Sequence, residues 1–164
     1  MKIFALKGHG ESGKTTTLKI LILKIYEHYP NLKIIYSNVP ITKNNIIIDI
    51  HNERINRRKN SHFDIENLQI VINIDLEIIG INTAGDNEHE VNKSIDIFKK
   101  YKCDIGFCAC RSKGITTKKL YKHYKNDIDF IFKSEIKNSS SYKNFDDWID
   151  LLNEWQAKEL FDLI

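Results

Sequence analysis

A glycine-rich segment near the start of the chain carries residue types that bind phosphate. Residues 8–15, GHGESGKT, fit the pattern G-x-x-x-x-G-K-[ST], with an apolar run before them and an amphipathic run after them. Glycines let the backbone wrap around phosphate oxygens, and the N-terminus of a following helix adds partial positive charge. We expect Lys14 to reach the β- and γ-phosphates of a nucleotide and the Thr15 hydroxyl to bind Mg²⁺. The expected nucleotide-binding residues are Gly8, His9, Gly10, Glu11, Ser12, Gly13, Lys14, Thr15 and Thr16.

The segment resembles the phosphate loop of the P-loop NTPase superfamily. Residues 8–16, GHGESGKTT, are similar above all to the loop of heterotrimeric G-protein α subunits, which also carry Glu-Ser-Gly-Lys at this place. The resemblance implies a three-layer α/β fold that binds a nucleoside triphosphate with Mg²⁺. The carboxylate of Glu11 would repel phosphate, so we expect Glu11 to contribute only its backbone N–H. We expect the same of His9, with its ring facing outward.

A P-loop enzyme usually holds Mg²⁺ with a second, acidic residue at the end of a neighbouring strand, and three aspartates compete for this role. Asp86 follows the apolar run and glycine loop IIGINTAG and precedes a helical pattern. Asp49 follows the apolar run NIII, but Ile50 indicates that this strand continues past it. Asp75 lies in the expected turn of a hairpin, at the wrong end of the sheet. Ligands bind beyond the carboxyl ends of such strands, so we expect Asp86 to serve the metal; Asp49 is the alternative, and the third possibility is neither.

The segment NTAGD, from Asn82 to Asp86, resembles the GTPase switch motif Asp-x-x-Gly with asparagine in place of the first aspartate. Asparagine lacks the charge that suits a hydrated divalent ion, so either Asp86 has taken the role or the loop senses the γ-phosphate through the Gly85 N–H. The guanine-reading motif Asn-Lys-x-Asp follows none of the expected strands, and NKSID at 92–96 has the wrong spacing. We therefore expect ATP as the nucleotide.

Two groups of basic residues have a possible role at the same site. Arg111 and Lys113 follow an apolar run, where they could stabilise charge on the transferring phosphoryl group, contact the base or a second substrate, or form a solvated turn. Arg54, Arg57 and Arg58 could form a lid or an arginine finger, although surface charge is the simpler interpretation.

The hydrophobic pattern predicts strands alternating with helices in one domain over residues 1–164. We expect strands at 3–6, 33–39, 45–50, 68–74, 77–83, 104–110 and 127–133, and helices at 14–29, 88–102, 115–125 and 146–164. Residues 52–62 are expected to form a loop or a short mobile helix, and 137–143 a polar linker. This order predicts a mainly parallel sheet with helices on both faces and one antiparallel hairpin at Asp75 and Leu76. The loops after Leu6, Thr83, Cys110 and Lys133 should then share one edge.

The C-terminal segment 146–164 has an apolar stripe at helical spacing. The stripe consists of Trp148, Leu151, Leu152, Trp155 and Leu160. We expect it to pack on the sheet; alternatively it offers an interface for a second copy or another protein.

Composition limits the other function classes. A net charge of +3 from 25 basic and 22 acidic residues makes nucleic acid possible but does not imply it. Cys103, Cys108 and Cys110 suit buried reduced thiols, and the spacing offers no fourth ligand for zinc. The most apolar run, 18–26, is too short to span a bilayer, and we expect a soluble, cytoplasmic protein without a membrane partner.

These patterns together predict Mg²⁺-dependent binding and hydrolysis of a nucleoside triphosphate, with Lys14, Asp86 and Arg111 as catalytic residues and Thr15 and Asp86 as metal ligands. Two alternatives stay open. One is a small nucleotide or nucleoside kinase, and the other is a nucleotide-dependent switch subunit with little turnover.

Overall fold

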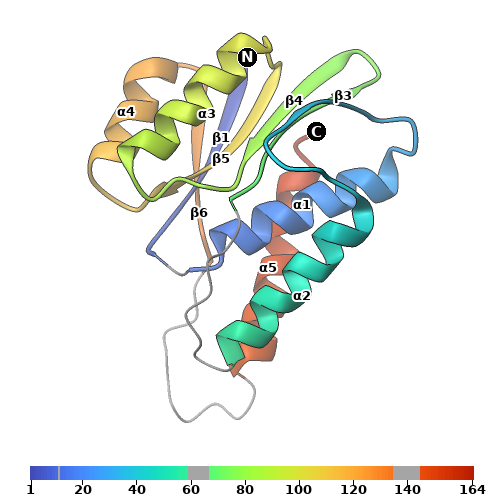
Figure 1. Ribbon diagram of the computed structural model, residues 1–164. Coiled ribbons are helices and arrows are strands. Elements are labelled where there is room, and N and C mark those ends of the chain that lie inside the picture. The colour runs from blue at the N-terminus through green and yellow to red at the C-terminus, as the bar shows by residue number, and fades with distance from the viewer. Residues whose placement is uncertain (11, 59–66, 135–144) are drawn as a thin grey trace.

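A six-stranded sheet lies between two layers of helices in the computed structural model, which describes residues 1–10, 12–58, 67–134 and 145–164, with residues 56–58 described by their backbone alone (Figure 1). The strands are β1 (Lys2–Gly8), β2 (Lys33–Ser37), β3 (Gln69–Ile74), β4 (Glu77–Asn82), β5 (Ile105–Arg111) and β6 (Ile128–Phe132). The helices are α1 (Lys14–His28), α2 (Lys43–Arg58), α3 (Glu88–Lys100), α4 (Ile115–Tyr124) and α5 (Phe145–Phe161).

The sheet is mainly parallel, as predicted. Its strand order is β2-β3-β4-β5-β1-β6, and β4, β5, β1 and β6 run in the same direction. Strand β3 is antiparallel to both of its neighbours. The predicted hairpin joins β3 to β4, and Asp75 occupies its turn with a φ of 53°. The expectation of an α/β protein with a mostly parallel sheet and one antiparallel hairpin is therefore confirmed.

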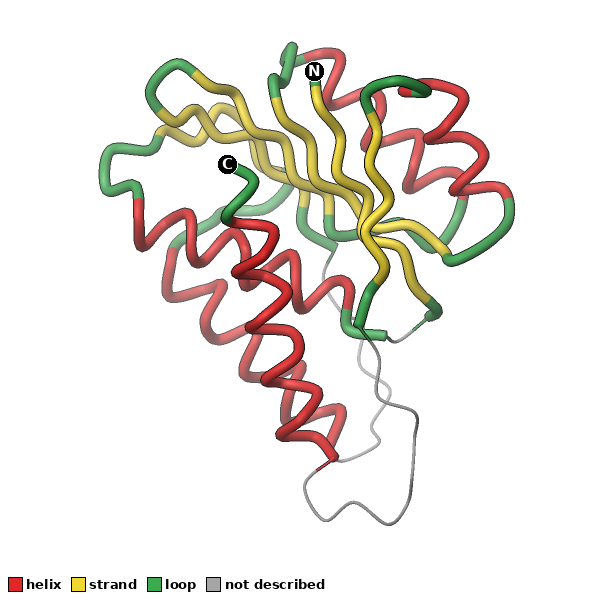
Figure 2. The backbone as a smooth tube through the Cα atoms, turned by 180° about the vertical axis from the view of Figure 1, so that it is seen from behind, coloured by secondary structure: helices red, strands yellow, loops and turns green. Residues whose placement is uncertain are grey.

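Alternating side chains of the strands feed two separate apolar cores. On β1, Phe4 and Leu6 face the core formed with α1, α2 and α5, whereas Ile3 and Ala5 face the core formed with α3 and α4. Seen from behind, in Figure 2, the two groups of helices lie on opposite sides of the strands. No helix within the described ranges has both the length and the apolar character needed to cross a membrane.

The predicted strand at 45–50 is wrong, because these residues lie in α2. Ile46 and Ile50 are buried one helical turn apart, and Ile47 and Ile48 between them are exposed. A run of isoleucines favours a strand by propensity, but here burial follows the i, i+4 spacing of a helix face. The helix continues to Arg58 through part of the segment expected as a loop or short helix; residues 59–62 of that segment and the expected linker at 137–143 lie outside the described residues.

Helix α5 packs with a different face from the predicted apolar stripe. Trp148, Leu151 and Trp155 are 53–59% exposed, and only Leu160 of the predicted stripe is fully buried. The buried face instead consists of Asn153, Gln156, Ala157 and Leu160. This face lies against α1, so α5 is a neighbour of α1 in the helical layer.

The three cysteines are free and buried, as expected for core residues. Burial raises the pKa of the Cys110 thiol to about 11, although a hydrogen bond with Thr117 and the charges of nearby lysines act in the opposite direction. Burial, together with Asp104, raises the pKa of Cys103 to about 11 as well. Both thiols are therefore neutral near pH 7.

Candidate functional site

The carboxyl ends of the parallel strands place the predicted loops along one edge of the sheet. Gly8 at the end of β1 lies opposite Arg111 at the end of β5, and Lys7 lies opposite Phe132 at the end of β6. Strand β4 ends at Asn82 on the same side. The loops that follow these strands therefore meet at one edge, which was expected from the alternation of strands and helices (Figure 1).

The glycine-rich loop between β1 and α1 encloses the side chain of Lys14. Gly13 precedes the helix in a left-handed conformation with a φ of 84°, which favours glycine. Lys14 is the first residue of α1 and is only 5% exposed. Its Nζ donates hydrogen bonds to the carbonyl oxygens of Gly8, at 3.3 Å, and His9, at 2.5 Å. The loop thus wraps around a buried ammonium group.

The Asp86 carboxylate meets this ammonium group and also pairs with Arg111. Asp86 Oδ1 lies 3.5 Å from Lys14 Nζ and 3.2 Å from Arg111 Nε. Arg111 Nε also lies 3.4 Å from the backbone oxygen of Asp86, to which it donates a hydrogen bond. A Cβ atom on Gly10 would lie 2.6 Å from Arg111 Nη1, so the guanidinium group rests on the loop itself. The structure therefore brings together the predicted catalytic residues from three separate segments.

Asp86 reaches Lys14 across the end of β5, which lies between β4 and β1 in the sheet. The crossing is so close that a Cβ atom on Gly85 would lie 1.8 Å from the Ala109 carbonyl oxygen. Only glycine fits at this position. On the other side of Asp86, its backbone N–H donates to Glu90 Oε2 at 2.6 Å, and Glu90 completes a capping box with Asn87 at the start of α3. Contacts on both sides thus hold Asp86 in place.

Asn82, the asparagine of the switch-like motif, faces α3. Its Nδ2 donates to Ser94 Oγ at 2.7 Å and to the Glu90 carbonyl oxygen at 3.3 Å, and its Oδ1 accepts from the Ala84 N–H at 3.1 Å. The residue is 1% exposed. Asparagine suits this position because the neighbouring groups require a side chain that both donates and accepts hydrogen bonds. The carboxylate at this edge is supplied by Asp86.

The threonines at the start of α1 point in different directions. Thr15 Oγ1 donates to the Thr83 carbonyl oxygen at 3.2 Å, which links the glycine-rich loop to the loop after β4. Thr16 Oγ1 donates to Glu53 Oε2 on α2 at 2.7 Å. The Thr16 hydroxyl therefore binds α2, and Thr16 can contact a ligand through its backbone.

The alternative metal ligand, Asp49, lies on a helix and not at the end of a strand. It lies in α2, where its carboxylate pairs with the buried ammonium group of Lys19 on α1, which also pairs with Glu53. This ion pair joins α1 to α2, and none of its residues lies at the end of a strand. Asp75 lies in the hairpin turn at the opposite end of β4 from Asn82, as predicted.

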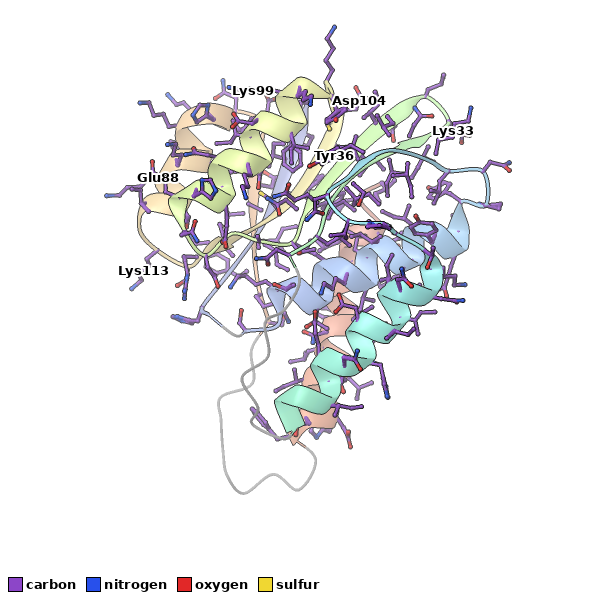
Figure 3. All side chains as sticks on the ribbon, viewed as in Figure 1. Lys33, Tyr36, Glu88, Lys99, Asp104 and Lys113 are labelled. Carbon is purple, nitrogen blue, oxygen red and sulfur yellow. The ribbon has the colours of Figure 1, made fainter. Side chains whose placement is uncertain are left out.

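Arg54 and Lys113, two of the other predicted basic residues, form no hydrogen bond or ion pair with Lys14, Asp86 or Arg111 in the described part of the chain. Arg54 pairs with Asp150 at 3.4 Å and Glu154 at 2.9 Å, so it ties α2 to α5. The side chains of Arg57 and Arg58 lie outside the described residues. Lys113 is exposed, and Figure 3 shows it pointing outward from the loop after β5. His9 is also exposed, and Glu11 lies outside the described residues.

Sequence reasoning missed two amides of α5 that contact the loops. Asn153 Oδ1 accepts a hydrogen bond from Thr17 Oγ1 at 3.2 Å. Gln156 Nε2 donates to the Phe132 carbonyl oxygen at 2.7 Å, and its Oε1 accepts from the Ser134 N–H at 3.2 Å. The sequence feature that could have revealed these contacts is the pair of amides, Asn153 and Gln156, three positions apart in an otherwise amphipathic helix.

Two oxygen-bearing side chains at this edge are of the kind that Mg²⁺ binds. Magnesium binds hard oxygen ligands and usually takes one or two side chains together with phosphate oxygens and waters. The Thr15 hydroxyl and the Asp86 carboxylate supply this number, and both contact the loop or its neighbour. Within the described residues, no group of three or more histidine, cysteine, aspartate or glutamate side chains gathers as a metal site. A magnesium ion held with a nucleotide does not need such a group.

Comparison with known proteins gives no match to any family model, curated protein or solved structure.

Proposed function

We propose that this chain is a P-loop NTPase that binds ATP with Mg²⁺ at the loop between β1 and α1 and hydrolyses the γ-phosphate. The observation that carries the proposal is the buried Lys14 ammonium group, which loop carbonyl oxygens enclose and which pairs with Asp86, itself paired with Arg111. Phosphoryl transfer requires positioning and charge neutralisation more than covalent chemistry, and these residues supply both.

The polar groups around Lys14 have separate roles in this proposal. Backbone N–H groups of the loop and of the first turn of α1 bind the phosphate oxygens, with the helix N-terminus adding positive charge. Lys14 exchanges its contacts with the Gly8 and His9 carbonyls for the β- and γ-phosphates. Arg111, which already lies against Gly10, stabilises the charge that develops on the transferring phosphoryl group.

Thr15 and Asp86 would hold Mg²⁺, which neutralises phosphate charge when it is bound. The Thr15 hydroxyl, which contacts the Thr83 carbonyl oxygen, and the Asp86 carboxylate, which pairs with Lys14 and Arg111, would be the protein ligands of the ion. ATP is proposed over GTP because the guanine-reading motif does not follow any of the parallel strands.

The test is phosphate release, together with thermal stabilisation by ATP, GTP, CTP and deoxynucleotides, each with and without Mg²⁺. ATP should raise the melting temperature most, because ligands that bind the folded state stabilise it in proportion to the logarithm of saturation. Arg111→Ala should lower the rate of phosphate release about 100-fold while the protein still binds ATP, as for the loss of one preorganised charge-stabilising group. Lys113→Ala, on the same loop, is the matched control and should keep the rate. Equal rates for both variants would contradict the role of Arg111.

A second candidate is a nucleotide-dependent switch with little turnover. It is favoured by α5, whose amides contact both the loop helix α1 and the loop after β6. Tight ATP binding without phosphate release, together with a nucleotide-dependent change in oligomer size, would support the switch over the hydrolase. Acceleration of ADP formation by a nucleoside or nucleotide acceptor would instead support a kinase.

A further inference from the structure

Asn153 is a buried amide in the middle of α5, far in sequence from the glycine-rich loop. It is 0% exposed, in the face of α5 that packs on α1. Its Oδ1 accepts from Thr17 Oγ1, and the Thr17 backbone N–H donates to the Gly13 carbonyl oxygen at 2.9 Å. Asn153 is therefore bonded to the first turn of the helix that follows the loop.

The same amide lies directly against the last glycine of the loop. A Cβ atom on Gly13 would lie 2.7 Å from Asn153 Oδ1 and 3.2 Å from Asn153 Nδ2. Gly13 holds a left-handed backbone conformation, with a φ of 84°. Asn153 thus occupies the space on the side of Gly13 where a side chain would project, and it limits how the loop can move toward α5.

The amide also has an unused donor. Asn153 Nδ2 is buried without a hydrogen-bond partner in the described part of the chain, and so is the Ser12 hydroxyl, which belongs to the same loop. Buried polar groups are nearly always paired, so this donor is available to an acceptor when the site is occupied. Both unpaired atoms belong to the phosphate loop or to a residue that touches it.

We propose that Asn153 is a positioning residue that holds Gly13 and the first turn of α1 in the phosphate-binding conformation. When phosphate orders the loop, Nδ2 pairs with an acceptor of the loop, and α5 responds to occupation of the site. This inference rests on the proposed function, since it assumes that the loop binds phosphate. It adds a residue from the C-terminal helix that neither the glycine-rich motif nor the switch-like motif contains.

The experiment compares Asn153→Ala with Leu160→Ala, a matched control on the same buried face of α5 whose side chain belongs to the apolar core. Calorimetry measures the binding of inorganic tripolyphosphate and of ATP, both with Mg²⁺. Asn153→Ala should weaken both about tenfold, because the loss of a hydrogen-bonded contact acts on the phosphates and not on the base. Leu160→Ala should lower the melting temperature but change both affinities less than twofold.

Tryptophan emission provides a readout that a purely structural role would not change. The chain has two tryptophans, Trp148 and Trp155, and both lie on α5. Saturating tripolyphosphate should shift the emission of the unmodified protein and of Leu160→Ala, whereas Asn153→Ala should show no shift. Thr17→Val, which removes the hydroxyl that donates to Asn153, should show an intermediate loss and serves as the second test if Asn153→Ala does not fold.

Each outcome decides a separate point. Unchanged affinity in Asn153→Ala, or in Thr17→Val where that variant replaces it, overturns the inference and leaves the proposed function intact. Equal loss of affinity in Asn153→Ala and Leu160→Ala also overturns it, because packing alone would then account for the effect. A lack of binding of both ATP and tripolyphosphate to the unmodified protein overturns the proposed function, and the inference with it.

Discussion

Replacement of Gly85 by alanine should separate the geometry of the site from the stability of the fold. A Cβ atom at this position would lie 1.8 Å from the Ala109 carbonyl oxygen and 2.2 Å from the carbonyl carbon, whereas ordinary contact begins at 3.4 Å. These atoms belong to the backbone of β5, at the centre of the sheet, and cannot turn aside. The loop after β4 must therefore move away by about 1.6 Å.

The displacement falls on Asp86, the next residue. Asp86 lies 3.5 Å from Lys14 Nζ and 3.2 Å from Arg111 Nε, so a shift of this size breaks both contacts. Misplacement of a reacting group by about 1 Å can cost about 100-fold in rate. We therefore expect Gly85→Ala to lower phosphate release at saturating ATP about 100-fold, with an overpacking cost of about 1–3 kcal/mol in the free energy of unfolding.

Gly80→Ala is the matched control, since Gly80 lies on β4, the strand that precedes the loop of Gly85, and its Cβ atom would meet a different neighbour. Its Cβ atom would lie 2.5 Å from Phe98 Cδ1, in the core beneath α3, so it should also destabilise the protein. It should leave the rate per folded molecule unchanged. Phosphate release is measured at a temperature where thermal unfolding shows both variants to be folded. If Gly85→Ala retains the rate of Gly80→Ala, the assignment of Asp86 to the site is refuted.

Three further predictions concern the surroundings of the site. Asn82→Asp replaces the Nδ2 group, which donates to the Glu90 carbonyl oxygen, with a carboxyl oxygen that faces the same carbonyl. This change should lower the free energy of unfolding by about 3 kcal/mol. Because a buried carboxyl group has a raised pKa, stability should fall as pH rises, and equal urea midpoints at pH 5 and pH 8 would contradict this. Lys19→Met leaves Asp49 and Glu53 without their cation and should lower the free energy of unfolding by about 3–5 kcal/mol. The double variant Lys19→Met with Glu53→Leu should recover most of this loss. If chemical denaturation shows that the losses of the two substitutions add, the assignment of the buried ion pair is contradicted. Burial raises the pKa of Cys103 and Cys110 from 9.0 to about 11, so the stability that their neutral thiols contribute is complete below pH 9 and is lost as pH rises through 11. Rapid reaction of the thiols of the folded protein with a disulfide reagent at pH 8 would contradict their burial.

The elements that local sequence determines were predictable. The glycine-rich loop, with an apolar strand before it and a helix after it, is a local pattern, and the structure has β1 and α1 at those positions. Asp75 in a hairpin turn was likewise evident from two apolar runs separated by a tight turn. The placement of Asp86 was predictable in part, because a strand followed by a glycine loop and a helix indicates the carboxyl edge of a sheet.

The features that the sequence could not give depend on how distant segments pack. The isoleucines of α2 follow either strand propensity or a helix face, and only contact with α1 decides between them. The crossing of Asp86 over β5 depends on the strand order, which places β5 between β4 and β1. Asn153 contacts Thr17 because α5 packs on α1 through a face containing two amides, whereas the apolar residues Trp148, Leu151 and Trp155 remain exposed.

The central claim is that the loop around Lys14 binds the phosphates of a nucleotide. The most direct test is calorimetric titration of ATP with Mg²⁺ into the unmodified protein, Lys14→Ala and Lys33→Ala, the last being an exposed lysine on β2, away from the site (Figure 3). We predict that Lys33→Ala binds as the unmodified protein does, and that Lys14→Ala loses binding by about 100-fold or more, as expected when a desolvated charge pair is removed. Undiminished binding to Lys14→Ala would contradict the assignment of the phosphate loop.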